Sequence, residues 1–163
     1  MTPDALNTAL AERGVRFALA VTGAGMTGAT DFFRASGASR FLDEICIPYS
    51  SEATARLLGA APKKHVCLDT AFRLAEAMSS RCFQGQPKTV ALGVEGALFC
   101  EGQRPERANV VHYAAIYRDL QGEERSCSTM LVFLPDSTRE SQERAASRRL
   151  HDFMLECASL ACS

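Results

Sequence analysis

The residues whose type and spacing most clearly suggest chemistry form a glycine-rich run, Gly23-Ala24-Gly25-Met26-Thr27-Gly28. Its spacing matches the Gly-x-Gly-x-x-Gly pattern that places the phosphates of a dinucleotide on a helix N-terminus. An apolar run over residues 16–21 predicts a buried strand before it, and a short helix is predicted over residues 26–35. Two interpretations stay open. Either the run is a tight turn that requires small residues, or it is a loop whose free N–H groups donate hydrogen bonds to a phosphate or carboxylate.

Dinucleotide binding is a weaker interpretation of the same run. The fingerprint requires an acidic residue at the C-terminal end of the second strand, where the ribose lies. Asp43 and Glu44 instead fall at the start of the strand predicted over residues 43–48. The remaining chain ends in a hairpin rather than in a second nucleotide-binding half. We therefore expect neither NAD nor FAD, and we predict no cofactor.

The histidines and cysteines show no pattern of a catalytic or metal site. His65, His112 and His151 are dispersed, and no Cys/His cluster has the spacing of zinc ligands, so we predict no metal. No Gly-x-Ser-x-Gly elbow is present to begin a Ser-His-Asp triad. The seven cysteines are dispersed and odd in number, which is typical of reduced thiols in a cytoplasmic protein.

Charged residues suggest one further contact with a ligand. Arg104 and Arg107 lie in a loop predicted over residues 96–108 and could hold a phosphate, because guanidinium groups match its geometry. A solvated loop explains them equally well. The charged run from Arg139 to Arg149 alternates in sign on a predicted helix, and we interpret it as a solvated face.

Length and composition limit the kind of fold that can position these residues. The 163 residues suit a single domain, 1–163, and 47% of them are hydrophobic. The 18 basic and 19 acidic residues leave a net charge of -1, which argues against a nucleic-acid partner. No apolar run approaches the roughly 20 residues that span a bilayer, so no membrane partner is expected. The N-terminal residues also lack the basic and apolar regions of a secretory signal.

Helices and strands alternate along the chain. Ser50 is the expected N-cap of one helix and Gly59 its end. A capping box, Ser137 to Glu140, opens the last helix. The pattern predicts an α/β fold with helices on both faces of a mixed sheet of about five strands. Helices are predicted over 3–13, 26–35, 50–58, 67–82 and from 137 onward, and strands over 16–21, 43–48, 89–94, 110–117 and 126–134.

Several segments, taken in chain order, resemble the C-terminal domain of the CinA competence/damage-inducible proteins. The resemblance runs from about residue 15 to about residue 151. The family patterns are Thr-Ala-Glu-Ser-x-Thr-Gly-Gly, Gly-Ser/Ala-Ser, Tyr-Ser-Asn-Glu-Ala-Lys and Gly-Ile-Ala-Gly-Pro. The matching segments here are residues 19–29, Gly37-Ala38-Ser39, Tyr49-Ser50-Ser51-Glu52-Ala53-Thr54 and Gly93-Val94-Glu95-Gly96-Ala97.

This resemblance implies a three-layer α/β/α sandwich and a cleft shaped for a nucleotide, because the stand-alone form of the domain is nicotinamide-mononucleotide deamidase. The family's nucleophilic Ser falls on Gly25, the Glu before it on Ala24, and its Lys on Thr54. Serine hydrolysis requires an activated hydroxyl, which Gly25 lacks. The backbone of the Gly93–Gly96 turn and Thr27 are retained. The ligand-binding residues implied are Gly23, Gly25, Thr27, Gly28, Tyr49, Ser50, Gly93 and Gly96, with Arg104 and Arg107 nearby.

The sequence therefore predicts a catalytically degenerate relative that binds a nucleotide or a phosphorylated small molecule and forms a homodimer. One alternative is an active amidohydrolase whose nucleophile has moved to a nearby hydroxyl, such as Thr27 or Ser50. The other is a dimeric protein-interaction module with a vestigial cleft.

Overall fold

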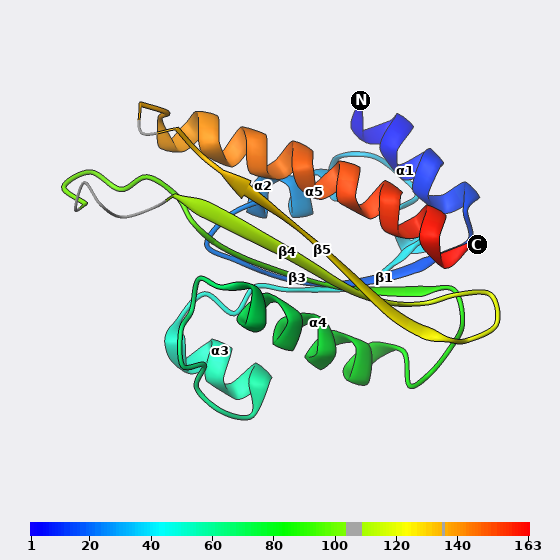
Figure 1. Cartoon of the computed structure of the whole chain (residues 1–163). Helices are drawn as coiled ribbons and strands as arrows, with labels where there is room; N and C mark the ends of the chain where they lie inside the picture. Colours follow the sequence, from blue (N-terminus) through cyan, green and yellow to red (C-terminus); the bar gives the residue numbers. More distant parts are fainter. Residues whose placement is uncertain (104–108, 135) are drawn as a thin grey trace.

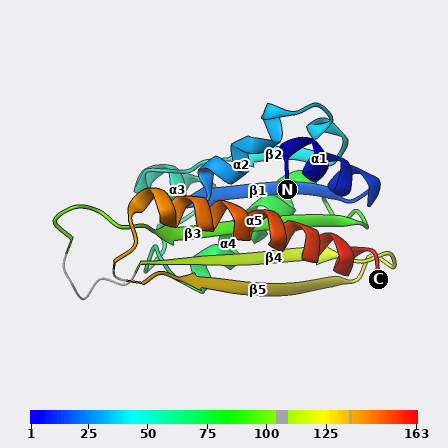
Figure 2. The same cartoon turned by 90° about the horizontal axis from the view of Figure 1, so that it is seen from above.

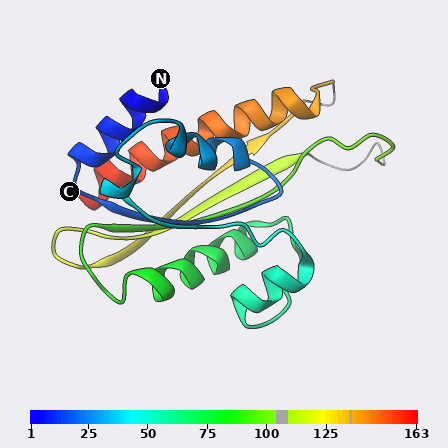
Figure 3. The same cartoon turned by 180° about the vertical axis from the view of Figure 1, so that it is seen from behind.

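A five-stranded sheet lies between two layers of helices in the computed structural model, which describes residues 1–103, 109–134 and 136–163. Figure 1 shows α1, α2 and α5 on one face of the sheet and α3 and α4 on the other, and Figure 3 shows the same layers from behind. The strands are β1 Arg16–Thr22, β2 Leu42–Cys46, β3 Thr89–Ala97, β4 Val110–Arg118 and β5 Glu124–Val132. The helices are α1 Pro3–Glu12, α2 Met26–Asp31, α3 Ser51–Leu58, α4 Leu68–Cys82 and α5 Arg139–Ala161.

The strand order is β2-β1-β3-β4-β5, as Figure 2 shows from above. Strands β2 and β3 both pair with β1 in parallel, whereas β4 and β5 continue the sheet antiparallel. The mixed three-layer sandwich is therefore confirmed. The chain leaves β1 through α2 on one face to reach β2, and it returns through α3 and α4 on the other face to reach β3. From the carboxyl end of β1 the chain turns toward β2, and from the carboxyl end of β3 it turns toward β4, so the connections diverge between these two strand ends.

Apolar side chains fill both faces of the sheet, because successive strand residues point to opposite sides. The face under α5 carries the larger cluster, which includes Leu19, Leu92 and Tyr113. The face under α4 is lined by small residues such as Ala18 and Ala20. Gly93 belongs to this second face, where a Cβ would overlap the carbonyl oxygen of Ala71. Small side chains let α4 lie close against the strands.

Local signals place most helix ends where the sequence predicts them. Ser50 caps α3 by accepting the N–H of Ala53, and Gly59 ends the helix with a φ of 75°. The last helix begins one residue later than predicted, because Thr138 is its N-cap and accepts the N–H of Ser141. The helix predicted over residues 26–35 is shorter. It ends as α2 at Asp31 and continues as a single 3₁₀ turn, Phe32–Arg34.

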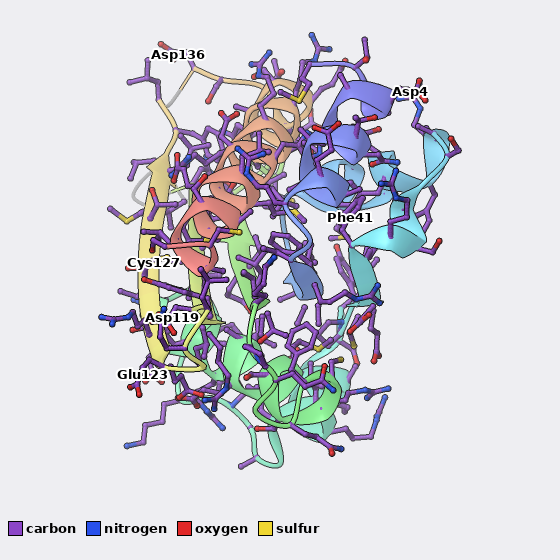
Figure 4. The ribbon with its side chains drawn as sticks, turned by 90° about the vertical axis from the view of Figure 1, so that its right-hand side faces the viewer. Asp4, Phe41, Asp119, Glu123, Cys127 and Asp136 are labelled. Carbon is purple, nitrogen blue, oxygen red and sulfur yellow. The ribbon has the colours of Figure 1, made fainter. Side chains whose placement is uncertain are left out.

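The β4–β5 hairpin turns at the predicted place, and Asp119 organises the turn. Its buried carboxylate accepts the N–H groups of Gln121 at 3.0 Å and Glu123 at 2.9 Å, and it pairs with Arg125 at 3.1 Å. Figure 4 shows Asp119 and Glu123 at this end of the hairpin, with Cys127 further along β5. A short acidic side chain that binds the backbone two residues on is a common way to stabilise such a turn.

Strand β3 is longer than predicted, and two glycines that were expected to form a turn lie within it. The strand runs on to Ala97, so Gly93 and Gly96 both lie within it and do not form a turn. The expected Gly93–Gly96 turn is therefore wrong. Both residues lack a Cβ for packing reasons, since a Cβ at Gly96 would come 2.6 Å from the Cβ of Ala24.

All seven cysteines are free thiols. In the part of the chain that the structure describes, no helix is both long and apolar enough to cross a membrane.

Candidate functional site

A cavity of about 360 Å³ opens between the carboxyl ends of β1 and β3, where the chain connections diverge. The two strand ends supply Thr22, Gly23 and the end of β3 to its wall. Ligands of open α/β sheets bind in the crevice at such a point. The other polar side chains of the wall are Tyr49, Ser51 and Thr54 at the start of α3, His65 ahead of α4, Cys100, and Arg139 at the start of α5.

Glu95 is the buried carboxyl group of this cavity. The residue is 4% exposed, and its Oε2 has no hydrogen-bond partner among the described residues. Burial raises the pKa of Glu95 to about 8, because the charged form loses its hydration. At neutral pH the carboxyl is therefore mostly protonated, and it can both donate and accept a hydrogen bond.

The strand register places Glu95 between a hydroxyl and an imidazole. Glu95 is the direct partner of Thr22 on β1 and of His112 on β4, so all three lie on the face that α4 covers. Burial lowers the pKa of His112, and the positive charge of Lys64 lowers it further. The three side chains form a row of polar groups across β1, β3 and β4.

Sequence reasoning missed Glu95 as a functional residue. The family pattern Gly-Ile-Ala-Gly-Pro has a neutral residue at this position, and only the flanking glycines match it. One signal was available, because Glu95 is the only charged residue in the nine-residue strand Thr89–Ala97. A charged residue is almost never fully buried in a strand without a partner or a purpose.

The glycine-rich turn binds a carboxylate that belongs to the protein itself. Gly25 donates its N–H to Oε2 of Glu143 at 2.9 Å, and Thr27 donates its N–H to Oε1 at 2.8 Å. Gly28 donates its N–H to Oγ of Ser147 at 2.8 Å. These three N–H groups could otherwise have donated hydrogen bonds to a phosphate. The interpretation of the helix as a wholly solvated charged face is wrong at Glu143.

Replacing Glu143 with alanine is expected to destabilise the protein by about 2 kcal/mol. The change leaves two N–H groups without their charged acceptor, and hydrogen bonds to charged groups contribute roughly 1.5 to 3 kcal/mol each when buried. We reduce the sum because the Thr27 bond is exposed. The matched control is Glu140→Ala on the same helix. Its carboxylate is 83% exposed and pairs only with Arg144, so the loss should stay below about 0.5 kcal/mol.

Urea unfolding followed by circular dichroism measures both changes. The loss or gain of helix propensity is the same in the two variants and cancels in their difference. Equal midpoints for Glu143→Ala and Glu140→Ala would show that the carboxylate does not hold the turn.

The structure separates the residues that the sequence grouped into one site. Gly23, Tyr49 and Gly96 line the cavity. Thr27 instead lines a neighbouring groove of about 680 Å³ between α2 and α5. Gly25 and Gly28 bind α5, Gly93 lies beneath α4, and Ser50 caps α3 while Ser51 takes its place in the wall. Arg104 and Arg107 lie outside the described residues.

The positions that match the family's nucleophile and lysine hold no reactive group. Gly25 has a φ of 77° and is the N-cap of α2. Thr54 is buried, and its Oγ1 donates to the carbonyl of Pro48 at 2.8 Å. Asp43, the acidic residue of the dinucleotide pattern, forms an ion pair with Arg16 at the opposite end of the parallel strands. Within the described ranges, no group of three His, Cys, Asp or Glu residues is placed to hold a metal ion.

The same fold is found in solved structures of competence/damage-inducible proteins. A competence or damage-inducible protein from Enterobacter asburiae superposes with a TM-score of 0.73 at 19% identity, covering 99% of both chains. A CinA superfamily protein from Klebsiella pneumoniae gives 0.76 at 18% identity, covering 97% of this chain and 96% of that one. The competence/damage-inducible protein CihA from Agrobacterium tumefaciens gives 0.75 at 18% identity and 96% coverage of both chains. No protein-family model matches the sequence, and no curated protein matches it.

Proposed function

We propose that this chain binds a nucleotide or another phosphorylated small molecule in the cavity between β1 and β3. The observation that carries the proposal is the cavity's place, at the carboxyl ends of the parallel strands β1 and β3, from which the chain continues toward opposite edges of the sheet. Its volume of about 360 Å³ falls in the range of roughly 300 to 1,000 Å³ that is typical of ligand pockets.

The wall offers the groups that such a ligand requires. Arg139 contributes a guanidinium, which suits a phosphate, and it is held by a hydrogen bond of 3.1 Å to the carbonyl of Phe99. Thr22 and Ser51 contribute hydroxyls. Tyr49 is 66% exposed at the cavity, so its ring is available to stack on a planar group.

We also propose that the chain is a CinA relative that does not hydrolyse amides through serine. The fold likeness and the ordered sequence segments support the relationship. The missing hydroxyl at Gly25 argues against serine chemistry, because no side chain is present there to attack a carbonyl carbon. The hydroxyl of Thr54, at the lysine position, is already bonded to the backbone. Binding is therefore the better-supported function of the cavity.

A thermal-shift experiment tests this proposal. Nicotinamide mononucleotide, NAD, ATP, CTP and inorganic phosphate are compared with an added dye, because the chain contains no Trp. A ligand at a hundred times its Kd adds about 2.7 kcal/mol to the stability. For a chain of this size that corresponds to roughly 5 to 10 °C in Tm. A protein whose Tm responds to none of these compounds would contradict the proposal.

Two arginine variants locate the binding. Arg139 lines both the cavity and the neighbouring groove, so Arg139→Gln should reduce the shift wherever the phosphate lies between them. Arg148→Gln changes only the neighbouring groove and should leave the shift intact. A shift that disappears in Arg148→Gln would move the site to the groove.

A further inference from the structure

Glu95 has an unfilled hydrogen-bonding capacity inside the cavity. Its side chain is 96% buried, lines the cavity wall, and leaves Oε2 without a partner among the described residues. More than nine in ten buried polar groups have a partner. Leaving one without a partner costs roughly 1 to 3 kcal/mol. A group retained at that cost in a cavity is a candidate for contact with the molecule that enters.

The neighbouring side chains do not take up this capacity. Thr22 and His112 flank Glu95 in the strand register, yet neither forms a hydrogen bond with it in the described structure. The hydroxyl of Thr54 already donates a hydrogen bond to the carbonyl of Pro48. The partner of Glu95 must therefore come from outside the fold or from solvent.

The chemistry of Glu95 restricts what that partner can be. An ionised carboxylate repels a phosphate, and a neutral one offers it a single donor. A metal ion would require further acidic ligands, and the described residues hold no group of three such side chains. A neutral carboxylic acid has a donor and an acceptor side by side. It is complementary to a planar group that carries an acceptor next to a donor.

We infer that Glu95 recognises the edge of a nucleobase, which it meets with two parallel hydrogen bonds, while Arg139 takes the phosphate. This inference rests on the proposed function and assigns the orientation of the ligand. Adenine and cytosine both present a ring nitrogen beside an exocyclic amino group. The carboxyl O–H donates to the ring nitrogen, and the carbonyl oxygen accepts from the amino group.

The contact requires a protonated Glu95 carboxyl, because only the protonated form carries the O–H donor. The titratable and charged groups that face Glu95 are His112 on β4 with Lys64 beside it, and the cavity residues His65, Tyr49, Cys100 and Arg139. Burial raises the pKa of Glu95 to about 8. The donor is therefore mostly present at pH 7 and mostly absent at pH 9. A group with this pKa is about ten times less protonated at pH 9 than at pH 7.

The test measures binding of AMP, CMP and inorganic phosphate by calorimetry at pH 7 and pH 9. Wild type should bind AMP or CMP about tenfold more weakly at pH 9. The phosphate group of AMP and CMP is mostly doubly ionised at both pH values, because its second pKa is about 6. Inorganic phosphate gains negative charge between the two pH values, so its affinity is compared between proteins at the same pH. Glu95→Gln keeps a donor beside an acceptor without titrating, so its nucleotide affinity should be the same at pH 7 and at pH 9.

Glu95→Met removes both hydrogen bonds at similar side-chain length. It should weaken AMP or CMP binding at least tenfold at pH 7, while the affinity for inorganic phosphate stays that of wild type. Nucleotide binding that is equally strong in Glu95→Met and wild type overturns the inference and leaves the proposed function intact. A wild-type protein that binds none of the three probes overturns the inference together with the proposed nucleotide site.

Discussion

Replacing Gly23 with alanine is expected to destabilise the protein by roughly 2 to 5 kcal/mol. Gly23 has a φ of 79°, which costs an alanine about 1 to 2 kcal/mol. A Cβ at this position would also overlap the carbonyl oxygen of Gly96 on β3. Backbone atoms cannot move aside as a side chain can, so the ends of β1 and β3 must separate. Over-packing of this kind adds about 1 to 3 kcal/mol.

The matched control lies two residues further on in the same turn. Gly25 has nearly the same φ, 77°, but the nearest atoms to a Cβ there are 3.9 Å away. Gly25→Ala should therefore show the conformational cost alone, about 1 to 2 kcal/mol. Urea unfolding of both variants measures the difference. If Gly23→Ala is no less stable than Gly25→Ala, the close approach of the turn to Gly96 does not contribute.

Replacing Glu95 with glutamine is expected to make the protein more stable than wild type at pH 9, by up to about 4 to 5 kcal/mol. The pKa of Glu95 is raised from 4.5 to about 8 in the folded state. Between these two values the folded protein holds a proton that the unfolded chain has released. Wild-type stability therefore falls as the pH rises through this window, and the loss is complete above pH 8. One pKa unit corresponds to about 1.4 kcal/mol.

The measurement is the difference in unfolding free energy between Glu95→Gln and wild type from pH 4 to pH 9. Other ionisable groups, including His112 and the ion-paired carboxylates, contribute equally to both proteins and cancel. The difference should be nearly constant near pH 4 and should then grow steadily in favour of the variant. Two curves that run parallel across this range would mean that Glu95 does not titrate in the folded protein as its burial requires.

The elements that sequence analysis predicted well are those with local causes. Helix α3 begins at Ser50 and ends at Gly59 because a hydroxyl cap and a left-handed glycine act within one turn of the chain. The hairpin turn at Asp119 depends on contacts two and four residues along. Short apolar runs predicted the strands for the same reason. Such signals lie close together in the sequence, so they can be recognised without the fold.

The parts of the site that sequence analysis missed depend on contacts between distant segments. Glu143 is 118 residues from Gly25, and its charge looks no different from that of Glu140 one turn earlier. The raised pKa of Glu95 comes from its burial on the face that α4 covers. Its place as the single charged residue of β3 marks it as unusual, but the sequence of β3 does not specify that burial. The glycine-rich pattern correctly located a turn, but whether its amides are open to a ligand is decided by the packing of α5.

The attachment of the turn to α5 has a consequence for local opening of the molecule. The N–H groups of Gly25, Thr27 and Gly28 all have their acceptors on one stretch of α5, at Glu143 and Ser147. His151, one turn further on, contacts the carbonyl of Gly28 at 2.8 Å. A helix moves as a unit over such a distance, so these amides lose their protection from solvent together. Their hydrogen exchange will therefore report one shared opening event, with a single free energy for the turn and this part of α5.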